Sequence, residues 1–330
     1  MGNEFKIILR QGDDITEVKA ILHELKEAKP VLYSLLRDLV TSGHEPSYTP
    51  DRAAQIKVLA KLPADLITQM KDFLVRDQEY QEKYFRGSDD EPKRTDHKVA
   101  GELFEILVRI QVSAEEKQSI DIPNTSERVS LSDLTNQFLE VWQYPQKFGI
   151  RAAWRNPDAA FLDIDAEGHI YLKAVGEVKA GLLDMRAFEQ LRVTGIEMQV
   201  KEVLKYLRSR PANWFDQNGL DALKVAKDSL DIHPDGLKIR LFVPAHKEVS
   251  KEGITRKQAE DLIKKRRGHE DRGDDALVQV PRHLQLKLNP VRVRVFMNLL
   301  QDSSRISVQQ AVFSGRELYT LANTIISQMK

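Results

Sequence analysis

Residues 155–181 read RNPDAAFLDIDAEGHIYLKAVGEVKAG, and this stretch decides the fold. Residues 158–165 and 170–180 are short, largely apolar runs bounded by turn residues, a pattern typical of β-strands. The residues between them, 166–169, include Gly168, which suits a tight turn. The stretch therefore predicts a β-hairpin, and residues 148–154 predict a third short strand before it.

Helical patterns lie on both sides of this hairpin. Before it, Leu103, Phe104, Leu107 and Val108 share one side of an expected helix. After it we expect, in chain order, a long helix over 185–208, a strand over 237–243, a basic helix through 264–267, a β-rich segment over 276–296 and a helix over 316–329. The order from residue 98, helix, three strands, helix and strand, predicts an α/β fold in which helices flank a mixed sheet.

The first ninety residues carry a different pattern, because their apolar residues recur at helical spacing throughout. Ile15, Val18, Leu22 and Leu25 belong to one such series. A charge-dense break, RGSDDEPKRTDH, ends this part of the chain. We therefore expect an additional α-helical N-terminal region over 1–96 and a main domain over 97–330, with a C-terminal extension from about residue 250.

Composition excludes several classes of protein. The chain has no cysteine, so a disulfide scaffold, a cysteine nucleophile and a thiolate zinc site are excluded. Its 50 basic and 50 acidic residues balance, so any surface that attracts a polyanion must be local. No apolar run approaches the ~18 residues of a membrane helix, and the N-terminus lacks the apolar core of a signal peptide. A cytoplasmic protein with no membrane partner is therefore expected.

The expected hairpin brings chemically active side chains together. Glu177 and Lys179 are two apart in a strand, so their side chains share one face, and Val178 faces the other way. If Asp165 faces the first residue of the second strand, Asp158 falls opposite Glu177. Directly opposed residues have Cβ atoms ~4.5–5.5 Å apart. Two carboxylates and one lysine would thus converge.

Two carboxylates this close repel each other unless a cation lies between them. Mg²⁺ is a hard cation that prefers oxygen ligands and keeps several of its waters. It can polarise a phosphoryl oxygen and lower the pKa of a bound water. Lys179 would orient that water or stabilise charge that develops on the phosphate. The constellation of Asp158, Glu177 and Lys179 therefore favours a phosphodiester as substrate.

These residues resemble the motif of the PD-(D/E)xK nuclease superfamily, which includes type II restriction enzymes, resolvases and repair nucleases. The match is Pro157-Asp158 followed by Glu177-Val178-Lys179, and the resemblance covers residues 98–245. It implies that Asp158, Glu177 and the backbone carbonyl of Val178 bind Mg²⁺, for which Mn²⁺ can substitute, and that Lys179 assists the attacking water. It also implies a restriction-endonuclease-like form of the mixed sheet.

The resemblance assigns two further residues on helices. Many members carry a glutamate in the helix before the sheet, in a Gly-x-x-x-Glu setting. Gly101 and Glu105 have this spacing, so Glu105 is a candidate catalytic residue and metal ligand, with Glu102 as the competing choice. Many members also carry a glutamine in the helix after the lysine, and Gln199 is the candidate there. The structural alternatives are a pair between Glu105 and Arg109 one turn on, and a solvated Gln199.

Other copies of the motif's parts lack its context. The tripeptides at 24–26, 91–93 and 115–117 also have the form Glu-x-Lys, but none lies on an expected strand shortly after a Pro-Asp pair. The alternatives at the motif itself are a simple turn at Asp158 and a weak ion pair between Glu177 and Lys179 on an exposed strand. The hairpin register and the flanking helices favour the catalytic interpretation.

Two groups of basic residues are candidate nucleic-acid contacts. The first is a run on an expected helix and the second shares one face of a strand-like stretch: Lys264, Lys265, Arg266 and Arg267, then Arg292 and Arg294. Their structural alternatives are a solvated helix face and an edge strand.

The motif predicts a Mg²⁺-dependent endonuclease that hydrolyses double-stranded DNA, of the type II restriction kind. We expect a homodimer, because cutting both strands needs two active sites. The first alternative is a repair, recombination or mobile-element nuclease of the same fold. The second is a non-catalytic nucleic-acid-binding or scaffold protein. Residues 1–96 would bind DNA, mediate dimerisation or regulate the enzyme.

Overall fold

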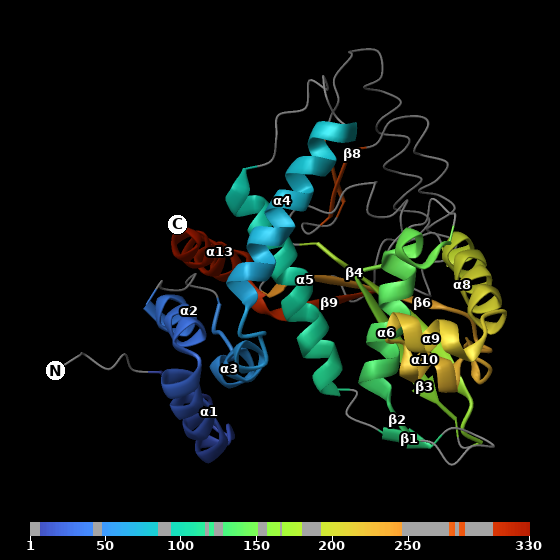
Figure 1. Cartoon of the computed structure of the whole chain (residues 1–330). Coiled ribbons are helices and arrows are strands. Elements are labelled where there is room, and N and C mark those ends of the chain that lie inside the picture. The colour runs from blue at the N-terminus through green and yellow to red at the C-terminus, as the bar shows by residue number, and fades with distance from the viewer. Residues whose placement is uncertain are drawn as a thin grey trace.

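The computed structural model of the chain describes residues 7–41, 48–84, 94–115, 119–121, 128–150, 157–165, 167–179, 193–245, 277–280, 284–287 and 306–330. Its helices surround one mixed sheet, so the expected α/β class is confirmed (Figure 1). Within these described ranges, no helix is both long enough and apolar enough to cross a membrane.

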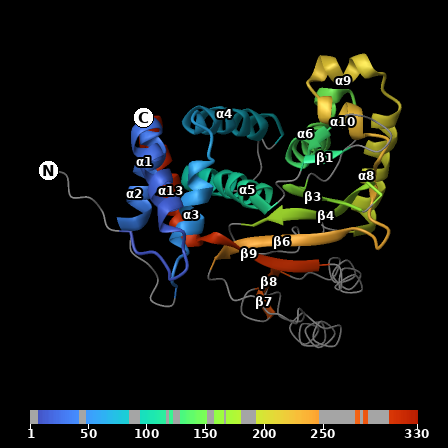
Figure 2. The same ribbon diagram turned by 90° about the horizontal axis from the view of Figure 1, so that it is seen from below.

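The sheet has the strand order β3 (Ala159–Ile164), β4 (Ile170–Val178), β6 (Lys238–Ala245) and β9 (Ile306–Ser314), and β5 (Leu230–Ile232) also pairs with β4. Figure 2 shows β3, β4, β6 and β9 next to one another in this order. β3 runs antiparallel to β4, whereas β4, β6 and β9 are parallel to one another. Parallel strands need crossover connections, which place helices over the faces of the sheet.

One face of the sheet packs on α6 (Leu131–Gln143), α8 (Val193–Arg208), α9 (Ala212–Asn218) and α10 (Asp221–Ala226). Ala160, Leu162 and Val175 point into this core, together with the fully buried Trp142 of α6. The short hairpin of β1 (Ser119–Asp121) and β2 (Arg128–Ser130) precedes α6, and η1 (Pro145–Phe148) follows it.

The other face contacts α3 (Arg52–Ala60), α5 (Thr95–Glu115) and α13 (Gly315–Met329). The helices α1 (Ile15–Ala28), α2 (Pro30–Thr41) and α4 (Leu66–Tyr84) pack on these three and belong to the same core. Ala159, Phe161 and Ala174 point into this second core. Successive residues of β3 thus enter opposite cores, as the two-residue period of a strand requires. The helices of the N-terminal region share this core with the sheet and with the last helix of the chain.

Polar residues begin several of these helices. Asp14, Asp51, Ser130 and Ser314 lie at the N-caps of α1, α3, α6 and α13, and each side chain accepts a backbone N–H from the first turn. At α13, Glu317 also accepts the backbone N–H of Ser314, which completes a capping box. These local signals explain why the helices start where they do.

A buried ion pair joins the N-terminal helices to the C-terminal helix. Arg52 of α3 lies 3.0 Å from Glu317 of α13, and their side chains are only 4% and 2% exposed. Gln55 donates to Glu317 at 3.0 Å and to the backbone carbonyl of Val312 at 2.7 Å. Tyr48 donates to the same carbonyl at 3.1 Å. The two ends of the chain are therefore tied together by a largely satisfied polar network within an apolar core.

Several sequence expectations need correction. The strand expected over 148–154 is wrong at its start, because Phe148 ends η1 and Gly149 adopts a left-handed φ of 74°; residues 151–154 lie outside the described part. The expected element order omitted α6, which lies between α5 and the hairpin, and β9, which completes the sheet. The long helix is described from Val193 only. β7 (Leu277–Val280) and β8 (Leu284–Lys287) form an antiparallel pair within the expected β-rich segment.

Candidate functional site

The site lies where β3 begins and β4 ends, beside α5. The register near the turn differs from the expected one, since Asp165 faces His169 rather than Ile170. The pairing then shifts by one residue between Leu162–Leu172 and Phe161–Ala174, which leaves Lys173 as the extra residue of a β-bulge. This one-residue shift compensates for the one-residue difference between the expected and the observed register at the turn. Asp158 therefore still enters the hairpin next to Glu177.

Asp158 is held by the backbone of β4. Its N–H donates to the carbonyl of Gly176 at 2.9 Å, and its Oδ2 accepts the N–H of Val178 at 2.6 Å. Gly176 allows this close approach, because a Cβ there would lie 2.9 Å from the Cβ of Ala159 and 3.1 Å from the Phe242 ring. Pro157 accepts a hydrogen bond from Gln143 of α6 at 2.8 Å, which secures the start of β3.

Glu177 and Lys179 share one face of the hairpin, as their spacing predicted. Lys179 Nζ lies 2.5 Å from Glu177 Oε1, and the Glu177 side chain is only 5% exposed, against 29% for Lys179. Val178 points into the core on the α5 side instead. The Lys179 N–H donates to Phe242 of β6 at 2.9 Å, so the end of β4 is fixed by the neighbouring strand.

Glu105 of α5 belongs to the same cluster. Burial raises its pKa well above the usual value, and repulsion from Asp158, Glu102 and Glu177 raises it further, while Arg109 opposes these effects. At Glu102, burial raises the pKa and Arg109 and Arg76 lower it. Asp158 and Glu177 are among the causes of the raised pKa of Glu105 but not of Glu102, and the assignment of Glu105 as the helix carboxylate of the motif stays a prediction.

Burial and crowding raise the pKa values of the carboxylates on the hairpin as well. Burial, followed by repulsion from Glu177, raises the pKa of Asp158 to about 7, although the Val178 N–H and Lys179 favour its ionised form. Burial also raises the pKa of Glu177, and Lys179 counteracts it. Burial alone would lower the pKa of Lys179, but the charge of Glu177 raises it instead. The ionised forms of Glu105, Asp158 and Glu177 are therefore disfavoured in the metal-free site.

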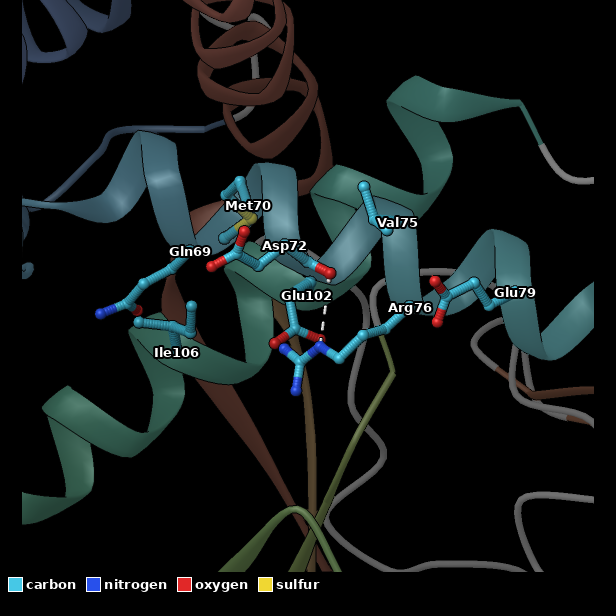
Figure 3. A pocket seen from close by; sticks show the side chains of 8 residues that line it. All are labelled: Gln69, Met70, Asp72, Val75, Arg76, Glu79, Glu102 and Ile106. Atoms are coloured by element: carbon cyan, nitrogen blue, oxygen red, sulfur yellow. Dashed lines mark hydrogen bonds between the residues drawn. The ribbon is translucent and has the colours of Figure 1, made fainter.

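Glu102 connects this cluster to a pocket of about 600 Å³ between α4 and α5. Figure 3 shows Glu102 of α5 and Arg76 of α4 pointing toward one another within it. Arg76 also donates to the backbone carbonyl of Asp72 at 3.3 Å. Met70, Val75 and Ile106 supply apolar lining, so the pocket is of mixed character.

The donor set of the cluster suits a hard divalent cation. Glu105, Asp158 and Glu177 offer carboxylate oxygens and Val178 offers a backbone carbonyl, which are ligands that Mg²⁺ and Mn²⁺ accept. Among the described residues, ligand atoms of three side chains lie mutually within 4.8 Å at Asp165, Glu167 and His169, in the turn of the hairpin. The three carboxylates of the cluster are spread more widely, so they would converge further around a cation.

The remaining candidate residues are distributed differently. Gln199 lies half-buried on α8, and its catalytic role stays a prediction. Lys264, Lys265, Arg266, Arg267, Arg292 and Arg294 lie outside the described residues. Sequence reasoning treated Arg109 only as a partner of Glu105, yet its charge acts on Glu102, Glu105 and Asp158. The four-residue spacing from Glu105 was the one available signal for it.

No family model, no curated protein and no solved structure matches the chain. The role of the candidate site is therefore inferred from its residues and their geometry alone.

Proposed function

We propose that the chain is a Mg²⁺-dependent endonuclease that hydrolyses phosphodiester bonds in double-stranded DNA. The observation that carries the proposal is the hairpin, which places Asp158 beside Glu177 and holds Lys179 Nζ 2.5 Å from Glu177, while the charges of Asp158 and Glu177 also act on Glu105. Neighbouring carboxylates that repel one another favour a bound cation, and an adjacent ammonium suits a reaction that builds negative charge. The order of Asp158, Glu177 and Lys179 on one hairpin also supports the resemblance to PD-(D/E)xK nucleases.

Each residue has a distinct role in this proposal. Asp158, Glu177 and Glu105 would hold the cation, with the carbonyl of Val178 as a further ligand. A bound Mg²⁺ would polarise the phosphoryl oxygen and make a coordinated water more acidic. The pKa of Lys179 is raised in the metal-free chain, so its ammonium is protonated at neutral pH and donates hydrogen bonds. Lys179 would therefore orient the attacking water or stabilise charge on the phosphate.

The proposal extends to the assembly. Hydrolysis of both strands at one place requires two active centres, which a symmetric homodimer supplies. We therefore propose a type II restriction-type enzyme that acts as a homodimer. Gel filtration with light scattering, in the presence and absence of DNA, measures the number of chains.

The test is a cleavage assay with Mg²⁺ or Mn²⁺ on supercoiled plasmid, long linear DNA, branched DNA and single strands. The Lys179→Ala variant should lose cleavage by at least about a hundredfold, because one donor to a developing charge is worth that much. Lys173→Ala is the matched control. Lys173 lies on the same strand and pairs with Asp163 at 2.6 Å, but that pair is exposed, so cleavage should be retained.

The pattern of products separates the alternatives. Discrete fragments from plasmid and linear DNA support a sequence-specific enzyme, whereas a preference for branched DNA favours a repair or recombination nuclease of the same fold. Equal cleavage by wild type and Lys179→Ala would refute the role of Lys179. An absence of cleavage on every substrate, together with no binding of Mn²⁺, would favour the non-catalytic binding or scaffold protein.

A further inference from the structure

The peptide group between Pro157 and Asp158 is held from both sides. Its N–H, which belongs to Asp158, donates to the carbonyl of Gly176 in β4 at 2.9 Å. Its carbonyl, which belongs to Pro157, accepts a hydrogen bond from Gln143 Nε2 of α6 at 2.8 Å. The N–H and the carbonyl of a trans peptide point in opposite directions. The strand β4 and the helix α6 therefore fix the plane of this peptide between them.

The proline makes the hydrogen bond from Gln143 more important. Pro157 has no N–H, so its carbonyl is the only backbone group through which this residue can be hydrogen-bonded. Pro157 is buried, and a buried carbonyl that lacks a donor is costly. The side chain of Gln143 thus secures the residue that directly precedes Asp158.

The carboxylate of Asp158 depends on the orientation of this peptide. Its Oδ2 accepts the N–H of Val178 at 2.6 Å. A rotation of the peptide plane before Asp158 would turn the bond from its Cα to its side chain and move both carboxylate oxygens. Only one hydrogen bond and one peptide group separate Gln143 from the atoms of Asp158 that would bind a cation.

The helix α6 is a firm support for Gln143. It packs on β3, and Val141 and Trp142, which directly precede Gln143, are fully buried. The N–H of Tyr144 donates to the carbonyl of Glu140 at 3.0 Å, which closes the last turn of the helix around Gln143. A donor on a packed helix keeps its position better than one on a loop.

We propose that Gln143 is a positioning residue, whose hydrogen bond to Pro157 holds Asp158 in the orientation that a divalent cation requires. This inference rests on the proposed function, in which Asp158 is a metal ligand. Gln143 touches neither the cation nor the phosphate and acts through Asp158. Loss of a group that orients a metal ligand typically lowers the metal affinity by about 10–100-fold.

Gln143→Met removes the donor with little change in side-chain length or helix propensity. The dissociation constant for Mn²⁺, measured by isothermal titration calorimetry without DNA, should rise by about tenfold or more. Gln137→Met is the matched control. Gln137 lies on the same helix and accepts the backbone N–H of Leu223 in α10 at 3.0 Å. This variant also costs α6 one hydrogen bond between a side chain and the backbone, but it should leave the affinity for Mn²⁺ unchanged.

Amide hydrogen exchange, measured by NMR, is a second readout that needs no metal. The N–H of Val178 is bound by the Asp158 carboxylate, so it should exchange about tenfold faster in Gln143→Met than in the wild type. Gln143→Glu keeps the shape of the side chain, but an ionised carboxylate cannot donate, so this variant should speed the same exchange. In Gln137→Met the N–H of Leu223 should exchange faster instead, and that of Val178 should not.

Equal losses of Mn²⁺ affinity in Gln143→Met and Gln137→Met would overturn the inference, because they would reflect a general weakening of α6. Unchanged exchange of the Val178 N–H in both Gln143 variants would also overturn it, since the Asp158 carboxylate would then keep its place without this donor. If the wild type binds no Mn²⁺, the proposed function fails, and the exchange of Val178 still decides whether Gln143 positions Asp158.

Discussion

Replacement of Asp158 by asparagine should stabilise the metal-free protein at neutral and alkaline pH. Burial and the charge of Glu177 raise the pKa of Asp158 from 3.8 to about 7 in the folded chain. A carboxyl group with a raised pKa binds its proton more tightly when folded, so its contribution to stability is highest below its unfolded pKa. Stability is then lost as pH rises from about 4 to about 7. Asparagine carries no charge and avoids this loss.

The magnitude follows from the same shift. A change of this size corresponds to about 4 kcal/mol once Asp158 is fully ionised. The carboxylate also accepts the Val178 N–H at 2.6 Å, and a neutral amide oxygen would accept it less strongly, by about 1–2 kcal/mol. We therefore expect Asp158→Asn to gain about 2–3 kcal/mol near pH 8. The gain should be smaller by about 2 kcal/mol near pH 5.5, where the folded wild-type carboxyl is mostly protonated.

Urea unfolding in EDTA at these two pH values measures the effect. Asp163→Asn is the control on the same strand, because a hydrogen bond from Lys173 lowers the pKa of Asp163 instead. That exposed pair is worth less than about 1 kcal/mol, so the control should be slightly destabilised. Saturating Mg²⁺ should stabilise the wild type more than Asp158→Asn. A loss of stability in Asp158→Asn near pH 8, or an equal gain at both pH values, would show that burial and repulsion from Glu177 do not dominate at Asp158.

Two further predictions concern the scaffold. Arg52→Ala should destabilise the protein by about 3–5 kcal/mol in urea unfolding, because Glu317 would be left buried without its cation. The control Arg94→Ala, which removes an exposed pair with Asp96, should cost less than about 1 kcal/mol. Similar losses of stability for both variants would contradict this view of the buried pair. Gly176→Ala should destabilise the protein by about 1–3 kcal/mol, because the new Cβ would press on Ala159 and the Phe242 ring. Gly101 lies inside α5 with no atom within 4 Å of its Cβ position, so Gly101→Ala should stabilise the protein by about 0.5–1 kcal/mol. Thermal unfolding of both glycine variants checks the two signs, and a stable Gly176→Ala protein would show that the hairpin can shift to accept the methyl group.

The hairpin shows how far sequence reasoning reached at the candidate site. Short apolar runs and a glycine turn predicted β3 and β4, and the two-residue period predicted that Glu177 and Lys179 share a face. The expected register at the turn was wrong by one residue, and the bulge at Lys173 cancelled that error. Neither detail could be predicted from the sequence, because the bulge depends on how both faces of β4 pack against the rest of the chain.

Distant parts of the fold were harder to predict. The strand β9 pairs in parallel with β6 across a long separation in sequence, and a parallel pairing leaves no turn signal between its strands. The partner of Arg52 is Glu317, 265 residues away, and neither residue type indicates a buried pair by itself. Arg109 had a visible sequence partner in Glu105, but its effect on Asp158 depends on how α5 lies beside the hairpin.

The sequence by itself determined the local elements and the types of reactive side chain, because these depend on residues close together in the chain. They include the helical and strand periods, the N-cap residues and the spacing of Asp158, Glu177 and Lys179. It also determined that no thiol takes part, since the chain has no cysteine. The tertiary structure alone decided which carboxylates crowd together and how far burial raises their pKa values. Burial and repulsion depend on distances in space, and those distances arise only when α5, β3 and β4 pack into one fold.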